Sequence, residues 1–274
     1  MPDPIVRASR VSYRVDGVPL VGHVDFEAAS GELVGVLGPN GAGKSTLLRL
    51  LAGDLLPDQG EVTLDGMGTA ERSTQDLALI RSMLADHVPN DIPFTVQAVV
   101  EMGRYPHRRS PDNSPERDAA AVTEAMLRTD TARFAGRIFA TLSSGERARV
   151  FLARVLAQDA PIVLLDEPTA SLDLANREHI LSEAALMARK QRAVVCVLHD
   201  VNAAAYYSDR LVLMAEGSIV AAGTPWEVLD PKLLSDVYGQ RMHVIEHPFR
   251  NCPLVLVGDD PRTTRTGPYS WSGC

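Results

Sequence analysis

The sequence is poor in cysteine, has no long apolar run and carries no surplus of positive charge. Its three cysteines, Cys196, Cys252 and Cys274, are too few and too scattered for a disulfide framework or a zinc site. A reduced cytosolic setting is therefore the simpler expectation. No apolar run approaches the length that spans a bilayer, and the N-terminal residues carry no secretory-signal pattern. The formal net charge of -8 argues against broad nucleic-acid binding as the main role.

The composition is that of a globular protein large enough to form a substantial core. Of the 274 residues, 45% are hydrophobic and 23% are charged, which fits one large domain or two small ones, and no internal repeat is found. Residues 5–37 alternate short β-like runs with turns, and Asp16-Gly17 predicts a hairpin. The apolar run at 32–38 predicts a buried strand, and residues 44–53 have helical spacing.

The middle of the chain is helical by pattern, and an α/β alternation follows it. Residues 95–158 contain three predicted helices, interrupted by a loop at 104–115 that is rich in proline, arginine and serine. This block indicates a helical insertion in an α/β scaffold. The alternation that follows includes a hairpin predicted at Glu216-Gly217. The expected parts are a core at about 1–86 and 159–240, a helical subdomain at about 87–158, and a C-terminal extension at 241–274 with a flexible tail.

The segment GPNGAGKST, residues 38–46, lies between a predicted strand and a predicted helix. It fits the pattern of a phosphate-binding loop in the context that such a loop requires. Its glycines let backbone N–H groups point at phosphate oxygens, and the helix N-terminus adds a favourable partial charge. Lys44 supplies a compact cation for the β- and γ-phosphates, and the Ser45 hydroxyl can ligate Mg²⁺. A glycine-rich turn with a chance Lys-Ser is the weaker alternative in this context.

Two predicted strands end in polar side chains near the expected phosphate loop. Asp166 ends the apolar run 162–166, Glu167 follows it, and His199 follows the next apolar run. Parallel strands of α/β folds end at a shared edge, where ligands bind. Asp166 can hold Mg²⁺, usually through water, and Glu167 is a candidate general base for an attacking water. The imidazole of His199 can hydrogen-bond a γ-phosphate, although taken alone it would be an ordinary strand-end histidine.

The stretch LSSGERARV, residues 142–150, combines a helix start with an unexpected glycine. Ser143 is followed three residues later by Glu146, which predicts a capping box that opens a helix. The cap does not explain Gly145, because glycine weakens the first turn of a helix.

The order of these motifs strongly resembles that of the nucleotide-binding subunits of ABC transporters: the phosphate loop, a helical block, then LSSGE, LLDEP, SLD and LHD. The resemblance covers about residues 5–240, and the combination is far more specific than any one motif. It implies an α/β fold, a P-loop NTPase of ABC type, with a mixed-sheet core, an N-terminal antiparallel β subdomain and an inserted helical subdomain. It also implies ATP hydrolysis with Mg²⁺ as cofactor, and a head-to-tail dimer that sandwiches two ATP molecules.

The resemblance also assigns roles to single positions. The nucleotide-binding positions are Tyr13, Gly38, Pro39, Asn40, Gly41, Ala42, Gly43, Lys44, Ser45 and Thr46. The positions that would face ATP held by the other subunit are Ser143, Ser144, Gly145 and Glu146, and those of the loop between the two sites are Ser171, Leu172 and Asp173. The catalytic pair would be Glu167 and His199, and the Mg²⁺ ligands Ser45, Asp166 and Asp86. Tyr13 stands at the place of an aromatic that stacks on adenine, or else is a plain strand-face tyrosine.

Two positions depart from the family pattern. Ser144 stands where L-S-G-G-Q has glycine, and it adds a Cβ and a hydroxyl that can donate to phosphate. Aligned on PFTV, Asp86 stands where the family has a glutamine that touches Mg²⁺ and the attacking water. Aspartate ligates a hard cation more strongly than an amide does, which bears on coupling and on the hydrolysis rate. The alternative is a solvent-exposed loop acid and an alignment shifted by a few residues, with Gln97 nearby inside the next predicted helix.

Three segments resemble the importer ATPases for iron complexes: GRYPHR at 103–108, GTPWEVLDPKLLSDVYG at 223–239, and a stretch near the C-terminus. VIEHPFRNCPLVLV, residues 244–257, is most similar to the haem-import branch, and siderophore and cobalamin importers are close alternatives. A soluble ABC ATPase of translation or DNA repair usually has two ATPase domains or a long coiled-coil insertion, and neither is visible. A non-hydrolysing, nucleotide-gated scaffold is a third class, against which Glu167 argues.

An importer subunit of this family implies particular partners and a location. The partners are a second copy of the chain, integral membrane permease subunits and, indirectly, a periplasmic or surface substrate-binding protein, with no nucleic acid. The expected location is the cytoplasmic face of the membrane, held there through the permease.

Overall fold

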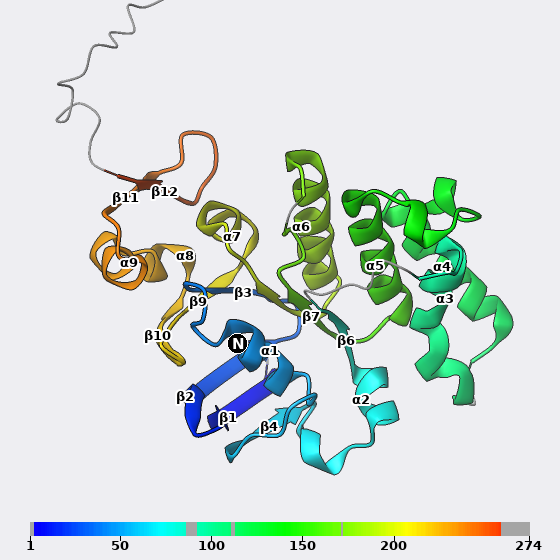
Figure 1. Ribbon diagram of the computed structural model, residues 1–274, viewed down its shortest axis with the longest axis horizontal. Helices are drawn as coiled ribbons and strands as arrows, with labels where there is room; N and C mark the ends of the chain where they lie inside the picture. Colours follow the sequence, from blue (N-terminus) through cyan, green and yellow to red (C-terminus); the bar gives the residue numbers. More distant parts are fainter. Residues whose placement is uncertain (1–2, 86–91, 111–112, 171, 259–274) are drawn as a thin grey trace, which may run out of the picture.

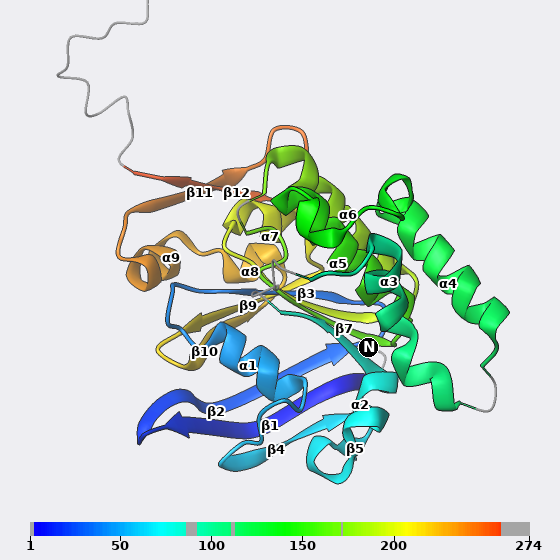
Figure 2. The same cartoon turned by 45° about the vertical axis from the view of Figure 1, so that its right-hand side comes forward.

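The structure is a computed structural model that describes residues 3–85, 92–110, 113–170 and 172–258. An antiparallel sheet and a larger sheet lie on either side of helix α1 (Lys44–Leu51), and further helices cover the far face of the larger sheet (Figures 1 and 2). Within the described ranges, no helix combines the length and the apolar character needed to cross a membrane.

The antiparallel sheet is built from the N-terminal strands in the order β2-β1-β4-β5. Its strands are β1 (Pro4–Val15), β2 (Val18–Ala29), β4 (Gln59–Leu64) and β5 (Met67–Gly68). The hairpin predicted at Asp16-Gly17 is confirmed, because β1 pairs with β2 across it. Both turn residues have positive φ, 50° and 80°, the conformation that matches the right-handed twist of the strands.

The larger sheet has the order β10-β9-β3-β8-β7-β6. Its strands are β3 (Leu33–Leu37), β6 (Arg81–Leu84), β7 (Ile162–Asp166), β8 (Ala193–Val197), β9 (Arg210–Ala215) and β10 (Ser218–Gly223). Neighbouring strands are parallel except that β10 runs antiparallel to β9, so the sheet is mixed as expected. The hairpin predicted at Glu216-Gly217 joins these two strands and is confirmed.

The central strands of the larger sheet, β3, β7 and β8, are buried on both faces, which explains their continuous apolar runs. In β7, Val163 and Leu165 belong to the core shared with the helices, whereas Ile162 and Leu164 belong to the core shared with α1 and the antiparallel sheet. The sheet therefore divides the buried residues into two cores.

The helices lie largely where the sequence predicts them. The α-helices other than α1 are α2 (Thr74–Ile80), α3 (Val96–Glu101), α4 (Pro115–Arg128), α5 (Ser144–Gln158), α6 (Leu174–Arg189), α7 (Val201–Tyr207), α8 (Pro225–Val228) and α9 (Pro231–Tyr238). Short 3₁₀ turns occur at η1 (Thr69–Glu71), η3 (Ala132–Phe134) and η4 (Phe139–Thr141). Helices α3, α4 and α5 group at one side of the sheet (Figure 1).

The prediction of a loop at 104–115 is wrong for residues 104–109. These residues belong to the 3₁₀ helix η2 (Met102–Arg109). The reason is its packing on the last turn of α5. A Cβ added at Gly103 would lie 2.3 Å from the Arg154 carbonyl oxygen, so the backbones touch. Arg104 donates to the Ala157 carbonyl at 2.8 Å, and His107 Nε2 lies 2.7 Å from the Gln158 carbonyl. These long-range contacts override the loop-like composition.

The chain ends, as far as it is described, in a two-stranded ribbon of β11 (Met242–Glu246) and β12 (Pro253–Val257). Asn202 of α7 holds the ribbon by pairing with both backbone groups of Val255, at 2.7 and 3.0 Å. The expected boundary near 240 falls between α9 and β11, and that near 158 coincides with the end of α5. The predicted boundary at 86–87 and the predicted flexible tail lie outside the described residues.

Candidate functional site

The segment between β3 and α1 forms a glycine-dependent loop that ends in a helix N-terminus. Gly38 and Gly43 have φ values of 148° and 91°. An added Cβ would lie 2.2 Å from the Met214 carbonyl oxygen at Gly38, and 2.4 Å from the Leu20 carbonyl oxygen at Gly43. Glycine is therefore required at both positions by conformation and by space. The loop opens directly into α1, whose first residue is Lys44.

Lys44 is buried inside the loop, with 5% of its surface exposed. Its ammonium donates to the carbonyl oxygens of Gly38 and Pro39, at 2.8 and 3.0 Å. Burial lowers the pKa of Lys44, and the nearby carboxylates of Glu167 and Asp166 act in the opposite direction. The cation is thus enclosed by the same loop whose N–H groups would bind phosphate.

A cavity of about 330 Å³ opens over this loop. Its lining residues are Leu20, Asn40, Gly41, Ala42, Gly43, Lys44, Ser45, Thr46 and Glu167. The structure thus brings together the phosphate loop and the predicted general base. Two neighbours were not found from the sequence. Leu20 lines the cavity from β2. The Tyr238 phenol of α9 is hydrogen-bonded to the Gly38 backbone, and burial raises the pKa of this phenol. No local signal marks either residue, because each arrives from a distant segment.

Ser45 and Asp166 form an oxygen pair beside Lys44. The Ser45 hydroxyl donates to Asp166 Oδ1 at 3.0 Å, and Asp166 is buried with 4% of its surface exposed. A hydroxyl and a carboxylate next to a phosphate loop fit Mg²⁺, which takes few protein oxygens and completes its shell with water and phosphate oxygens. Among the described residues, no group of three or more His, Cys, Asp or Glu side chains could hold a metal ion.

Glu167 and His199 meet at the carboxyl ends of β7 and β8, as predicted from their place in the sequence. Glu167 Oε1 lies 2.6 Å from His199 Nε2. Glu167 has a positive φ of 49°, a conformation that is uncommon for a residue other than glycine. This backbone turn directs the carboxylate toward both the cavity and the imidazole. The pair can position a water and a terminal phosphate group.

Tyr13 is half-buried in β1 and packs against the core beneath the antiparallel sheet. It pairs with Val21, the residue after Leu20, so it lies beside the cavity wall without belonging to the lining residues. Stacking on adenine remains a prediction for Tyr13.

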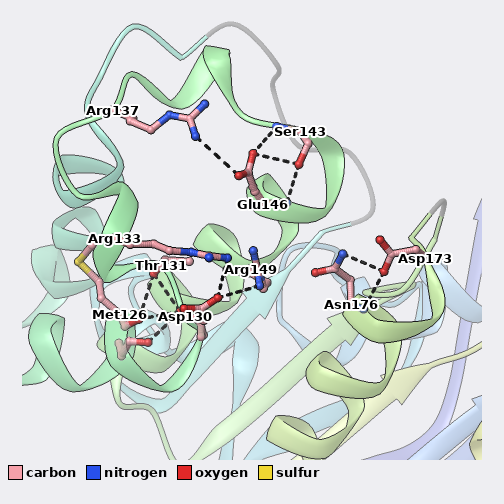
Figure 3. Close-up of polar contacts among 12 residues, drawn as sticks. Met126, Asp130, Thr131, Arg133, Arg137, Ser143, Glu146, Arg149, Asp173 and Asn176 are labelled. Atoms are coloured by element: carbon pink, nitrogen blue, oxygen red, sulfur yellow. Dashed lines mark hydrogen bonds and ion pairs between the residues drawn. The ribbon is translucent and has the colours of Figure 1, made fainter.

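The capping box predicted at the start of α5 is confirmed (Figure 3). Ser143 Oγ accepts from the Glu146 N–H at 3.3 Å, and Glu146 Oε2 accepts from the Ser143 N–H at 2.8 Å. That backbone hydrogen bond is the main reason why the pKa of Glu146 lies below its ordinary value. Arg137 adds an ion pair to Glu146 at 3.7 Å. Ser144 is the first residue of α5 and is exposed.

Gly145 is explained by a neighbouring helix. A Cβ added at Gly145 would lie 2.6 Å from Asn176 Nδ2, in the first turn of α6. Asp173 caps α6, and Leu172 before it is buried in the core shared with α5. The start of α5 is not among the described residues that line the cavity over the phosphate loop.

Other predicted site residues are placed as follows. Asp86 and Ser171 lie outside the described residues. Gln97 lies inside α3, as its pattern predicts, and its amide donates to Glu101 at 2.8 Å.

Comparison with known proteins agrees with this architecture. The family model for ABC transporters matches residues 21–170, which include the phosphate loop, the start of α5 and Asp166-Glu167. The chain belongs to the ABC transporter family. A dimeric structure of the bacterial ABC transporter cassette MJ0796 is similar to this chain, with a TM-score of 0.71 at 26% identity, covering 80% of this chain and 98% of that one.

Two curated relatives extend the similarity of this ABC protein beyond the matched segment. It is 47% identical over 257 residues to the hemin import ATP-binding protein HmuV of Streptomyces coelicolor, covering 94% of this chain and 91% of the relative. It is 48% identical over 233 residues to the protein of the same name from Nocardia farcinica, covering 85% of this chain and 80% of that relative.

Proposed function

We propose that this chain is the ATP-hydrolysing subunit of an ABC importer for haem. The observation that supports hydrolysis most directly is the contact of Glu167 with His199, 2.6 Å apart beside the phosphate loop. Similarity to hemin import ATP-binding proteins along most of the chain supports haem as the cargo. The same similarity favours haem over siderophores and cobalamin, which the sequence motifs alone leave open.

The phosphate loop would bind the triphosphate of ATP. Backbone N–H groups of the loop would hold the phosphate oxygens, and Lys44 would donate to the β- and γ-phosphates in place of the loop carbonyls. Ser45 and Asp166 would hold Mg²⁺, which neutralises charge on the phosphates when it is bound. Asp86, in the segment between core and helical subdomain, would be a third ligand.

Glu167 would accept the proton of the attacking water as that water approaches the γ-phosphate. His199 has two roles in this proposal: its imidazole would hold the Glu167 carboxylate in place, and it would hydrogen-bond the γ-phosphate. A general base of this kind accounts for about 10²–10⁴-fold in rate.

A second copy of the chain would complete each ATP site. The N-terminus of α5, with Ser143, Ser144, Gly145 and Glu146, would face the γ-phosphate bound by the other copy, while Ser171, Leu172 and Asp173 would communicate between the two sites. A capped helix N-terminus favours an anion through its free N–H groups and its dipole. The dimeric structure of the related cassette MJ0796 supports a second cassette as the partner.

The permease would bind at the helical side of the molecule. A hollow of about 500 Å³ there is lined by Thr74, Gln75, Ala78, Tyr105, Pro106 and Arg108. Tyr105 is 68% exposed, and the Arg108 guanidinium lies 5.5 Å from its ring centroid. Exposed tyrosine and arginine side chains are enriched where proteins bind one another. Docking there would hold the subunit at the cytoplasmic face of the membrane and link it indirectly to a substrate-binding protein.

Transport in reconstituted vesicles tests the proposal. The chain would be co-expressed with its permease, placed in proteoliposomes with the substrate-binding protein, and assayed with haem, cobalamin or a ferric siderophore. We expect haem alone to accelerate ATP hydrolysis and to accumulate, and Glu167→Gln to abolish both effects. Acceleration by cobalamin or a siderophore instead of haem would contradict the cargo, and hydrolysis without uptake of any of the three would contradict the importer.

A further inference from the structure

Helices α5 and α6 begin in the same way and side by side (Figure 3). Each follows a buried leucine of one shared core, Leu142 before α5 and Leu172 before α6. Arg147 in α5 donates through Nε to the Leu142 carbonyl at 2.8 Å. Arg177 in α6 donates in the same way to the Leu172 carbonyl at 2.7 Å. Both helix starts are thus fixed to the core, and the first turns face each other.

The contact between the two first turns is made by Asn176 and Gly145. A Cβ at Gly145 would lie 2.6 Å from Asn176 Nδ2 and 3.0 Å from its Cγ, closer than side chains pack. Gly145 is not in the left-handed region, so its backbone would accept alanine without strain. The neighbouring side chain, and not the backbone conformation, is what excludes a Cβ within this subunit.

The Asn176 side chain is not free to move away from Gly145. Its Nδ2 donates to Asp173 Oδ1 at 2.9 Å, and its own backbone N–H donates to the same oxygen at 2.8 Å. Hydrogen bonds to a carboxylate are stronger than those between neutral groups, so the amide is held in one orientation. Asp173 is the N-cap of α6, and Asn176 therefore connects that cap to the second residue of α5.

We propose that Asn176 is a positioning residue, which sets the placement of the α5 N-terminus relative to the Leu172-Asp173 segment. The proposal rests on the proposed function, in which this N-terminus contacts ATP held by a second copy. Because Gly145 has no side chain, the Asn176 amide lies directly against the α5 backbone. A shift of the Asp173 cap would therefore move the α5 backbone through this one amide. Asn176 thus acts on the trans nucleotide through Gly145 and does not touch that nucleotide itself.

The first test replaces Asn176 by alanine in a Glu167→Gln background, in which bound ATP is not consumed. The ATP concentration that gives half-maximal dimer is measured by light scattering in the presence of Mg²⁺. We expect Asn176→Ala to raise this concentration several-fold, while binding of a fluorescent ATP analogue to the dilute monomer is unchanged. Asn113→Ala is the matched control, because Asn113 also donates to an aspartate in a helix first turn, Asp118 at 3.0 Å, in α4.

The second test is a double-mutant cycle with Gly145→Ala. The added methyl collides with Asn176 only while that side chain is present, so Gly145→Ala should weaken dimer formation less in the Asn176→Ala protein than in the parent. Gly136→Ala is the control, because a Cβ there meets no atom within 4 Å.

The outcomes separate the inference from the proposed function. The inference would be overturned if Asn176→Ala left the ATP requirement for dimer formation equal to that of the Glu167→Gln parent. It would also be overturned if the effects of Gly145→Ala and Asn176→Ala on dimer formation were independent of each other. A loss of thermal stability without a change in the ATP requirement would assign Asn176 to packing alone and would also overturn it. A parent that forms no dimer with ATP would contradict the proposed function, and the inference with it.

Discussion

Glu167 adopts a backbone conformation, with a positive φ of 49°, that residues other than glycine disfavour. A residue other than glycine in the left-handed region costs about 1–3 kcal/mol, and such strain persists where the surroundings over-determine it. At Glu167 those surroundings are the end of the buried strand β7 and the imidazole of His199. The conformation directs the carboxylate into the cavity, where the proposed chemistry needs it.

Lys44→Ala should weaken ATP binding and remove hydrolysis. Hydrogen bonds to charged groups contribute about 1.5–3 kcal/mol, which is about tenfold or more in affinity. Titration with a fluorescent ATP analogue measures the loss, and Lys232→Ala, an exposed lysine of α9, is the control. Parent-like affinity and turnover in Lys44→Ala would contradict the role of this lysine.

Glu146 predicts a pH dependence of stability. Its pKa in the folded protein lies below the ordinary value of 4.5, chiefly through the Ser143 N–H. Because the pKa is depressed, the ionised Glu146 carboxylate stabilises the folded protein fully at a pH above 4.5. This stabilisation is lost as the pH falls through the lower pKa of the folded protein. Urea unfolding of the parent and Glu146→Gln should therefore differ most above this pH and converge below it. A difference that is constant across this pH range would count against the capping carboxylate.

Asp86 carries a prediction that rests on the sequence alone, since it lies outside the described residues. If it occupies the place of the family glutamine, Asp86→Gln should lower the apparent Mg²⁺ affinity and leave hydrolysis equal or faster, because a repelling charge is removed. Asp86→Ala should lose metal affinity without that gain. ATPase rates against Mg²⁺ concentration decide this, and superimposed curves would exclude Asp86 from the metal site.

Many individual residues of the site were predictable from the sequence, because they belong to short motifs. The phosphate loop, Asp166, Glu167 and the Ser143–Glu146 cap each combine residue type with a local position, and the structure arranges them accordingly. Leu20 and Asn176 were not predictable, because each acts through a contact with a segment far away in the sequence.

The helices and strands show the same division between local and long-range causes. Strands buried on both faces, such as β7 and β8, follow directly from continuous apolar runs. Hairpins follow from Asp-Gly and Glu-Gly turns. The 3₁₀ helix η2 was mistaken for a loop, because its composition is loop-like and its stability comes from the last turn of α5.

Gly103→Ala tests the docking of η2 on α5. The added Cβ would lie 2.3 Å from the Arg154 carbonyl oxygen, a backbone atom that cannot rotate away. Overpacking of this kind costs about 1–3 kcal/mol. Chemical denaturation should show that loss for Gly103→Ala and little change for Gly136→Ala, where the Cβ meets open space. Equal stability of the two variants would contradict the close backbone packing.

At the scale of the whole molecule, the phosphate loop and the N-terminus of α5 stand as separate parts of one subunit. The cavity over the loop is lined by residues from β2, from the loop and α1, and by Glu167, and α5 does not contribute to it among the described residues. The start of α5 nevertheless has the features of an anion site: a satisfied cap, N–H groups at a helix start and an exposed serine. A second copy placed head to tail would bring these two half-sites together.

Light scattering of Glu167→Gln with ATP and Mg²⁺ tests this account most directly. The variant should bind ATP without hydrolysing it, and its mass should change from that of one 29.6 kDa chain to twice that value. Glu216→Gln is the matched control, since Glu216 also follows a strand with a positive φ of 48° but lies at a hairpin turn. It should hydrolyse ATP like the parent and form no lasting dimer. A Glu167→Gln protein that stays monomeric at saturating ATP, or that hydrolyses ATP at the parent rate, would contradict the account.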